Sequence, residues 1–221
     1  MAKSNSRIAA HHRRLMRNIP FFTIPAVLFV LVCGIFLFIF SNNVEAQLAL
    51  HNAWYSSGGY KWMGFISHWG EWPLFAVVII FYCVKKSWSN AAEFFTAAVV
   101  SSVFVQVLKR IVFAPSPRPM SVIDWSNTQL STDLDLPLQF AFPSGHTTTA
   151  FVFFTLIALI WRRPAIQIFA VFCAIAVAIS RVYLMAHWII DVMAGAVLGM
   201  GIAVFVHSIF SRVQKKPLTR R

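Results

Sequence analysis

Long apolar runs with almost no charge constrain the fold of this chain more than any other feature. The first run, residues 21–40, has no charged side chain over 20 residues. A secretory signal has a shorter apolar core of about 7–15 residues, so we expect this run to remain as a membrane span. Only 12% of the 221 residues are charged, whereas a soluble domain is about a quarter charged. The sequence therefore predicts a multi-span membrane protein.

The apolar runs predict six spans. Each is close to the roughly 20 residues that cross a hydrocarbon core, and backbone groups in lipid must be satisfied within helices. The predicted spans cover residues 19–40, 67–84, 91–108, 144–161, 164–179 and 188–210. We therefore predict an all-α fold, a six-transmembrane-helix bundle. Residues 1–221 form one membrane-embedded domain with basic tails at 1–18 and 211–221.

The net charge of +12 is unevenly distributed. Six spans place both termini and the turns 85–90 and 162–164 on one side, which then holds 14 of the 19 basic residues. Lys and Arg accumulate on the cytoplasmic side of a membrane, so both termini are predicted to be cytoplasmic. Topology and contact with anionic lipid explain these charges, and no nucleic-acid partner is expected.

Five basic residues remain on the opposite side, where topology does not explain them: Lys61, Lys109, Arg110, Arg118 and Arg181. The first cluster that includes them runs over residues 109–119 and begins where the third span ends. Its prolines favour an extended, stiff chain that would hold an arginine in place. These cations could bind an anion or simply anchor the span at the interface.

The second cluster is Pro143-Ser144-Gly145-His146, at the start of the fourth span. A helix N-terminus presents free N–H groups and a partial positive charge, which suit an anion. Ser144 can cap the helix or bind a ligand, and Gly145 lets the backbone approach closely. His146 could donate a proton. The alternative is an ordinary capped helix start with an interfacial histidine.

The third cluster joins the fifth and sixth spans and contains Ser180, Arg181, His187 and Asp191. His187 and Asp191 are four residues apart, so on a helix they would share one face. A carboxylate there can orient the imidazole, and an ionisable group this far into an apolar segment suggests function. The alternative is a structural His–Asp pair.

Together the clusters place three cations, a helix N-terminus, two histidines and a carboxylate on one side of the membrane. This set suits a phosphoryl group, with one histidine as nucleophile and the other as acid for the leaving group. The spacing of Cys and His fits no zinc site, and no glycine-rich nucleotide loop is present. The residues alone leave open which histidine attacks, although the His–Asp spacing favours His187.

At these residues the chain resembles the type 2 phosphatidic acid phosphatase superfamily of membrane lipid phosphatases. The second and third clusters match the family pattern. The first departs from it, because eight residues rather than six separate Lys109 from Arg118-Pro119. Arg110 therefore becomes an alternative for the phosphate-binding cation. The matching motifs occupy residues 109–191.

The resemblance implies a phosphatase that needs no metal and no cofactor. His187 would attack phosphorus to form a phosphohistidine, Asp191 would hold His187, and His146 would protonate the leaving oxygen. The phosphoryl oxygens would be bound by Lys109, Arg118, Ser144, Gly145 and Arg181. The expected location is a bacterial cytoplasmic (inner) membrane, with the site on the periplasmic face.

The expected substrate is a lipid phosphate held in the bilayer, with undecaprenyl diphosphate ranked first. The alternatives are the 1-phosphate of lipid A, phosphatidylglycerophosphate or phosphatidate, or transfer of the phosphoryl group to another lipid. A transporter is the rival from another class, but its charges would line a path at mid-depth. His68 and Glu71 stay open to a substrate role, whereas Glu93 and His207 are predicted to be structural. The sequence carries no prediction of oligomeric state.

Overall fold

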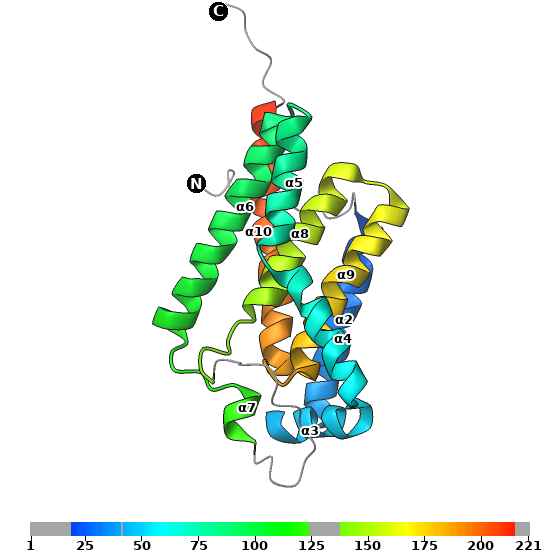
Figure 1. The fold of residues 1–221 in the computed structure, drawn as a ribbon, viewed down its shortest axis with the longest axis vertical. Coiled ribbons are helices and arrows are strands. Elements are labelled where there is room, and N and C mark those ends of the chain that lie inside the picture. The colour runs from blue at the N-terminus through cyan, green and yellow to red at the C-terminus, as the bar shows by residue number, and fades with distance from the viewer. Residues whose placement is uncertain (1–18, 41, 124–137, 215–221) are drawn as a thin grey trace, which may run out of the picture.

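A computed structural model describes residues 19–40, 42–123 and 138–214, and every regular element within them is a helix (Figure 1). In chain order the elements are α2 (Pro20–Ile39), α3 (Asn43–Trp54), α4 (Ser57–Ser67), η1 (His68–Gly70), α5 (Pro73–Val84), α6 (Trp88–Val107), η2 (Leu108–Val112), α7 (Pro119–Val122), α8 (Gly145–Trp161), α9 (Pro164–Tyr183) and α10 (Ile189–Gln214). The all-α prediction is confirmed for these residues.

The prediction of six spans is not confirmed. Among the described residues, four stretches are long and apolar enough to cross a membrane: α2, α6 continued by η2, α9, and α10 up to Val213. A fifth arises if α4, η1 and α5 are counted as one span, bent by 45°. The remaining predicted span is α8, an apolar helix of 17 residues and therefore about 26 Å long. Neighbouring helices bury most of α8, and its C-cap residue, Arg162, adopts a left-handed conformation.

The second predicted span, residues 67–84, differs most from the structure. Its helix begins ten residues earlier, at Ser57, and is interrupted between Gly70 and Pro73. Pro73 lacks an N–H and fixes φ, so it starts α5 instead of continuing the preceding helix. The segment 41–66, expected to be an outer connection, contains α3 and most of α4.

Among the described helices, α10 packs extensively against α8, and two glycines one turn apart allow a close approach. A Cβ at Gly195 would lie 2.9 Å from the Ser144 carbonyl oxygen, and one at Gly199 would lie 2.6 Å from that of Thr148. Small residues at this i,i+4 spacing let helix backbones approach closely in a membrane. The contact sets the first turn of α10 beside the first turn of α8.

The described ends of the helices divide between the two ends of the bundle. In Figure 1 the start of α2, the end of α10, and the turns α5–α6 and α8–α9 lie towards the top, whereas α3, α7 and the start of α8 lie lower. This arrangement agrees with the distribution of charge, and the cytoplasmic placement of the termini stays a prediction. Residues 1–18 and 215–221 of the basic tails, and the acidic residues Asp124, Asp133 and Asp135, lie outside the described residues.

Cysteine labelling tests the predicted topology. In a variant lacking Cys33, Cys83 and Cys173, we expect Gly58→Cys to react with an impermeant maleimide in intact cells, and Ser89→Cys to react only after lysis. Both positions are exposed, and a side chain at Gly58 would meet open space. The opposite labelling pattern would invert the topology.

Candidate active site

His187 and Asp191 form a buried pair at the start of α10. His187 Nδ1 lies 3.3 Å from Asp191 Oδ2, and both side chains are almost completely buried. The expectation that they share a helix face is wrong in detail, because α10 begins only at Ile189. Asp191 instead reaches back as the third helical residue and accepts the Trp188 N–H at 2.9 Å. This is the carboxylate half of a capping box, and it fixes Asp191 against the turn that carries His187.

The surroundings of His187 favour its neutral form. Burial lowers the pKa of His187 well below its usual range, and the positive charges of Arg181, Arg118 and Lys109 lower it further. A neutral imidazole that directs Nδ1 to Asp191 leaves Nε2 with a lone pair for attack. His187 is thus suited to act as a nucleophile at neutral pH.

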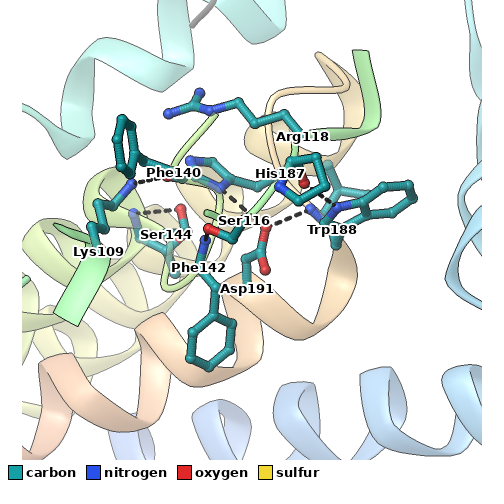
Figure 2. A network of polar contacts seen from close by, with 12 residues as sticks. Lys109, Ser116, Arg118, Phe140, Phe142, Ser144, His187, Trp188 and Asp191 are labelled. Carbon is teal, nitrogen blue, oxygen red and sulfur yellow. Dashed lines mark hydrogen bonds and ion pairs between the residues drawn. The ribbon is translucent and has the colours of Figure 1, made fainter. Parts of the chain in front are cut away.

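Lys109 and Arg118 are both buried and are held by the chain that precedes α8 (Figure 2). Lys109 Nζ donates to the Phe140 carbonyl at 2.8 Å, and Arg118 Nε donates to the Gln139 carbonyl at 3.1 Å. Trp188 Nε1 donates to the Pro117 carbonyl at 2.9 Å, which ties the same segment to the His187 turn. The carbonyls of Gln139 and Phe140 therefore hold the two cations, and the Trp188 bond fixes the proline-rich segment beside them.

Arg110, the alternative cation, points elsewhere. Its side chain is exposed, donates to Gln106 Oε1 at 3.1 Å, and lies over the Phe140 ring. Lys109, in contrast, has its Cε 3.9 Å from where a Cβ on Gly145 would be. The chain forms a single π-helical turn at Leu108–Val112, which holds one more residue than an α-helical turn. This turn absorbs part of the unusual spacing and keeps Lys109 at the site.

Arg181 lies in the last turn of α9, which continues to Tyr183 rather than ending near 179. Its guanidinium is buried, and Nη1 donates to Ser67 Oγ. Its buried Nε has no hydrogen-bond partner among the described residues. A buried guanidinium N–H is costly to leave unpaired, and an anion at the site would satisfy it.

Ser144 and Gly145 begin α8 beside this cluster. Ser144 is the N-cap: its Oγ accepts from Thr147 Oγ1 at 3.0 Å, and its N–H donates to the Asp191 carbonyl at 3.1 Å. A Cβ at Gly145 would make only ordinary contacts with Val105 and Lys109, so packing with the described residues does not require glycine. The predicted close approach of a ligand remains the explanation for Gly145.

His146 follows on the same turn and faces a carboxylate. Its Nε2 lies 3.5 Å from Glu71 Oε1, and the same oxygen lies 2.8 Å from His68 Nδ1. The His146 side chain is 32% exposed, so it borders open space, unlike the enclosed His187. Sequence reasoning placed Glu71 on the same side as His146 but did not predict this pairing, because the two residues are 75 positions apart in the chain.

Gln47 on α3 also supports the site and was not anticipated. Its buried Nε2 donates to the Val182 carbonyl at 2.9 Å and lies 3.4 Å from the His187 carbonyl. Nothing in the sequence near Gln47 marks it, since its partners are about 135 residues away. Away from the site, His207 Nδ1 lies 2.7 Å from Glu93 Oε1, so these two residues form the interhelical pair expected of structural residues.

The structure brings every predicted site residue to one place. The positive charges of Lys109, Arg118 and Arg181 act on His187, and the α8 N-terminus with His146 lies beside the His187–Asp191 turn. Three cations with free helix N–H groups can hold phosphoryl oxygens while His187 attacks. Within the described ranges, no three His, Cys, Asp or Glu side chains are grouped as metal ligands would be.

Comparisons with known proteins find relatives of this chain. Two curated relatives are lipid A 1-phosphatases, from Rhizobium johnstonii (32% identical over 126 residues) and Rhizobium etli (31% identical over 126 residues). Each match covers 57% of this chain but only 50% or 52% of the relative, so the chain matches about half of their length.

Two solved structures share the fold. Aquifex aeolicus LpxE matches with a TM-score of 0.60 at 23% identity, over 76% of this chain and 96% of that one. A phosphatidylglycerolphosphate phosphatase from Bacillus subtilis matches with a TM-score of 0.57 at 24% identity, over 90% of this chain and 99% of that one. The model of the PAP2 superfamily matches residues 90–215, more than half of the chain. This protein therefore belongs to the PAP2 superfamily.

Proposed function

We propose that this protein is a membrane lipid phosphatase that removes a phosphate from a sugar of a saccharolipid, as in lipid A 1-phosphate. The observation that carries the phosphatase assignment is the buried His187–Asp191 pair, surrounded by three cations at the N-terminus of α8. The substrate class is supported by the two relatives named lipid A 1-phosphatase. No comparison favours undecaprenyl diphosphate, the substrate ranked first from the sequence.

In the first step, His187 Nε2 attacks phosphorus and the bond from phosphorus to the lipid oxygen breaks. Asp191 accepts a hydrogen bond from the Nδ1–H of His187 and stabilises the positive charge that develops on the ring. Lys109, Arg118 and Arg181 bind the non-bridging oxygens, together with free N–H groups of α8. His146 gives its proton to the leaving oxygen, which departs as a neutral hydroxyl.

In the second step, water attacks the phosphohistidine and the P–N bond breaks. His146, now neutral, takes the proton from that water, and inorganic phosphate leaves the site. Side-chain cations and helix N–H groups supply the electrostatic stabilisation, so the reaction needs no metal ion.

We place the site at the periplasmic face of a bacterial cytoplasmic membrane, on the side that the charge distribution predicts to be outside.

Phosphate release by the purified protein in detergent tests this proposal. The panel contains lipid A 1-phosphate, phosphatidylglycerophosphate, phosphatidate and an isoprenyl diphosphate, each with and without EDTA. We expect the sugar phosphate to have the highest kcat/KM and EDTA to change the rate less than about twofold, because cationic side chains bind the phosphoryl oxygens. Loss of activity in EDTA that is restored by a divalent cation would contradict the metal-free mechanism.

The phosphotransferase alternative uses the same phosphohistidine but transfers its phosphoryl group to a lipid hydroxyl instead of water. Thin-layer chromatography of the panel reactions would reveal a newly phosphorylated lipid if transfer competes with hydrolysis.

A further inference from the structure

Glu71 lies beside His146 but takes no part in the two phosphoryl-transfer steps. It follows η1, and η1 packs directly on the start of α8: a Cβ at Gly70 would lie 2.7 Å from the His146 carbonyl oxygen. Such a short contact excludes a larger residue at 70, so η1 is held tightly against His146. The carboxylate that follows is therefore built into the site.

A cavity of about 320 Å³ adjoins this contact and is lined by Glu71, His146, Ser101, Ser102 and Thr149, among others. His187 does not line it, whereas Gly145 does. His146 protonates the leaving oxygen, and the leaving group departs on the side opposite His187 in an in-line displacement. The leaving group therefore enters the space beside Glu71 and the three hydroxyls.

The two histidines differ in the carboxylate beside them. The positive charges of Lys109, Arg118 and Arg181 reach both histidines, whereas the carboxylate beside His146 is Glu71 and the one beside His187 is Asp191. The Glu71 Oε1 atom lies 3.5 Å from His146 Nε2. A group bonded to an oxygen that His146 protonates would thus lie within roughly 8 Å of this carboxylate.

We propose that Glu71 makes the enzyme select lipids whose leaving group is a neutral alcohol over diphosphates, whose leaving group is itself a phosphate. A sugar hydroxyl can donate to the carboxylate and to the neighbouring hydroxyls. The second phosphate of an isoprenyl diphosphate brings a negative charge to the same place and is repelled. This inference rests on the proposed phosphatase function and explains why the substrate class would be a saccharolipid.

The test compares kcat/KM for lipid A 1-phosphate and for an isoprenyl diphosphate in identical micelles, in wild type, Glu71→Gln, Glu71→Asp and Glu45→Gln. Glu45 is an exposed carboxylate on α3, so its variant makes the same charge change away from His146. We expect Glu71→Gln to raise the diphosphate-to-monoester ratio about tenfold, because a unit charge at this distance is removed. Glu71→Asp and Glu45→Gln should keep the wild-type ratio.

The ratio separates selection from positioning, since a disturbed His146 would slow both substrates alike. An unchanged ratio in Glu71→Gln would overturn the inference even if both rates fell. A wild-type preference for the diphosphate would overturn it as well. If wild type released phosphate from neither lipid, at the same background rate as His187→Ala, the proposed function would be wrong and this inference with it.

Discussion

His187→Ala is expected to reduce phosphate release from lipid A 1-phosphate by at least about 10³-fold, because it removes the group that forms the covalent intermediate. Residual activity should not recover at high substrate concentration, since the loss lies in kcat. His187→Asn should be equally inactive: its amide can still reach Asp191, but it cannot form a phosphohistidine. Rapid acid-free quenching with labelled substrate should trap a phosphoprotein in wild type and in neither variant.

Folding controls are essential for His187, because its side chain is fully enclosed and paired with Asp191. Alanine leaves a cavity and an unpaired carboxylate, which together destabilise a protein. His187→Asn is the closer match in size. Gel filtration and thermal unfolding in detergent should show that this variant keeps the fold. A folded His187→Asn protein with near wild-type turnover would rule out His187 as the nucleophile.

Lys109→Ala should lower kcat/KM about 10²-fold, the usual effect of removing one donor to a developing anion. Arg110→Ala should lower it less than about threefold, because an exposed cation beside the site contributes only through a screened field. Lys109 is buried against Gly145 and Phe140, whereas Arg110 is exposed and bonded to Gln106. The two variants remove the same charge from adjacent residues, so each controls for the other.

The comparison should be made at several salt concentrations. The defect of Lys109→Ala should persist at 0.5 M salt, because buried charges are screened much less than exposed ones. If only Arg110→Ala impaired turnover, Arg110 would be the phosphate-binding cation and the position of Lys109 would have a structural role. Equal defects in both variants would show that net charge, rather than the placement of one amine, controls binding.

Some parts of the site could be predicted because they depend on local features. The Pro143-Ser144-Gly145 stretch predicted a helix start, because serine is a favoured N-cap, and Ser144 is the N-cap of α8. Asp191 could be paired with His187 because only three residues separate them, although a cap rather than a shared helix face joins them. The choice between Lys109 and Arg110 could not be made, because a π-helical turn changes which side chain faces inward.

Other parts depend on residues far apart in the chain. Glu71 meets His146, and Gln47 supports the His187 turn, across 75 and about 140 residues respectively. The i,i+4 spacing of Gly195 and Gly199 in the sequence indicates a close contact between helices. It does not indicate which helix is the partner, and the structure shows that it is α8. The bend before α5 likewise joins residues 57–70 to residues 73–84. From hydropathy, most of the first segment is predicted to be an outer connection and the second to be a span.

By itself the sequence determined that the chain enters a membrane as helices, because apolar runs with few charges have no other way to satisfy their backbone in lipid. It also indicated the chemical groups of the candidate site, since clustered cations, a helix N-terminus and two histidines suit a phosphoryl group. Only the tertiary structure decided which cation faces inward and that α8 is a short buried helix. The position of the Glu71 carboxylate beside His146 was likewise decided by the tertiary structure alone. These features depend on contacts between distant helices, whose free energy comes from the fit of one surface against another and not from local residue preference.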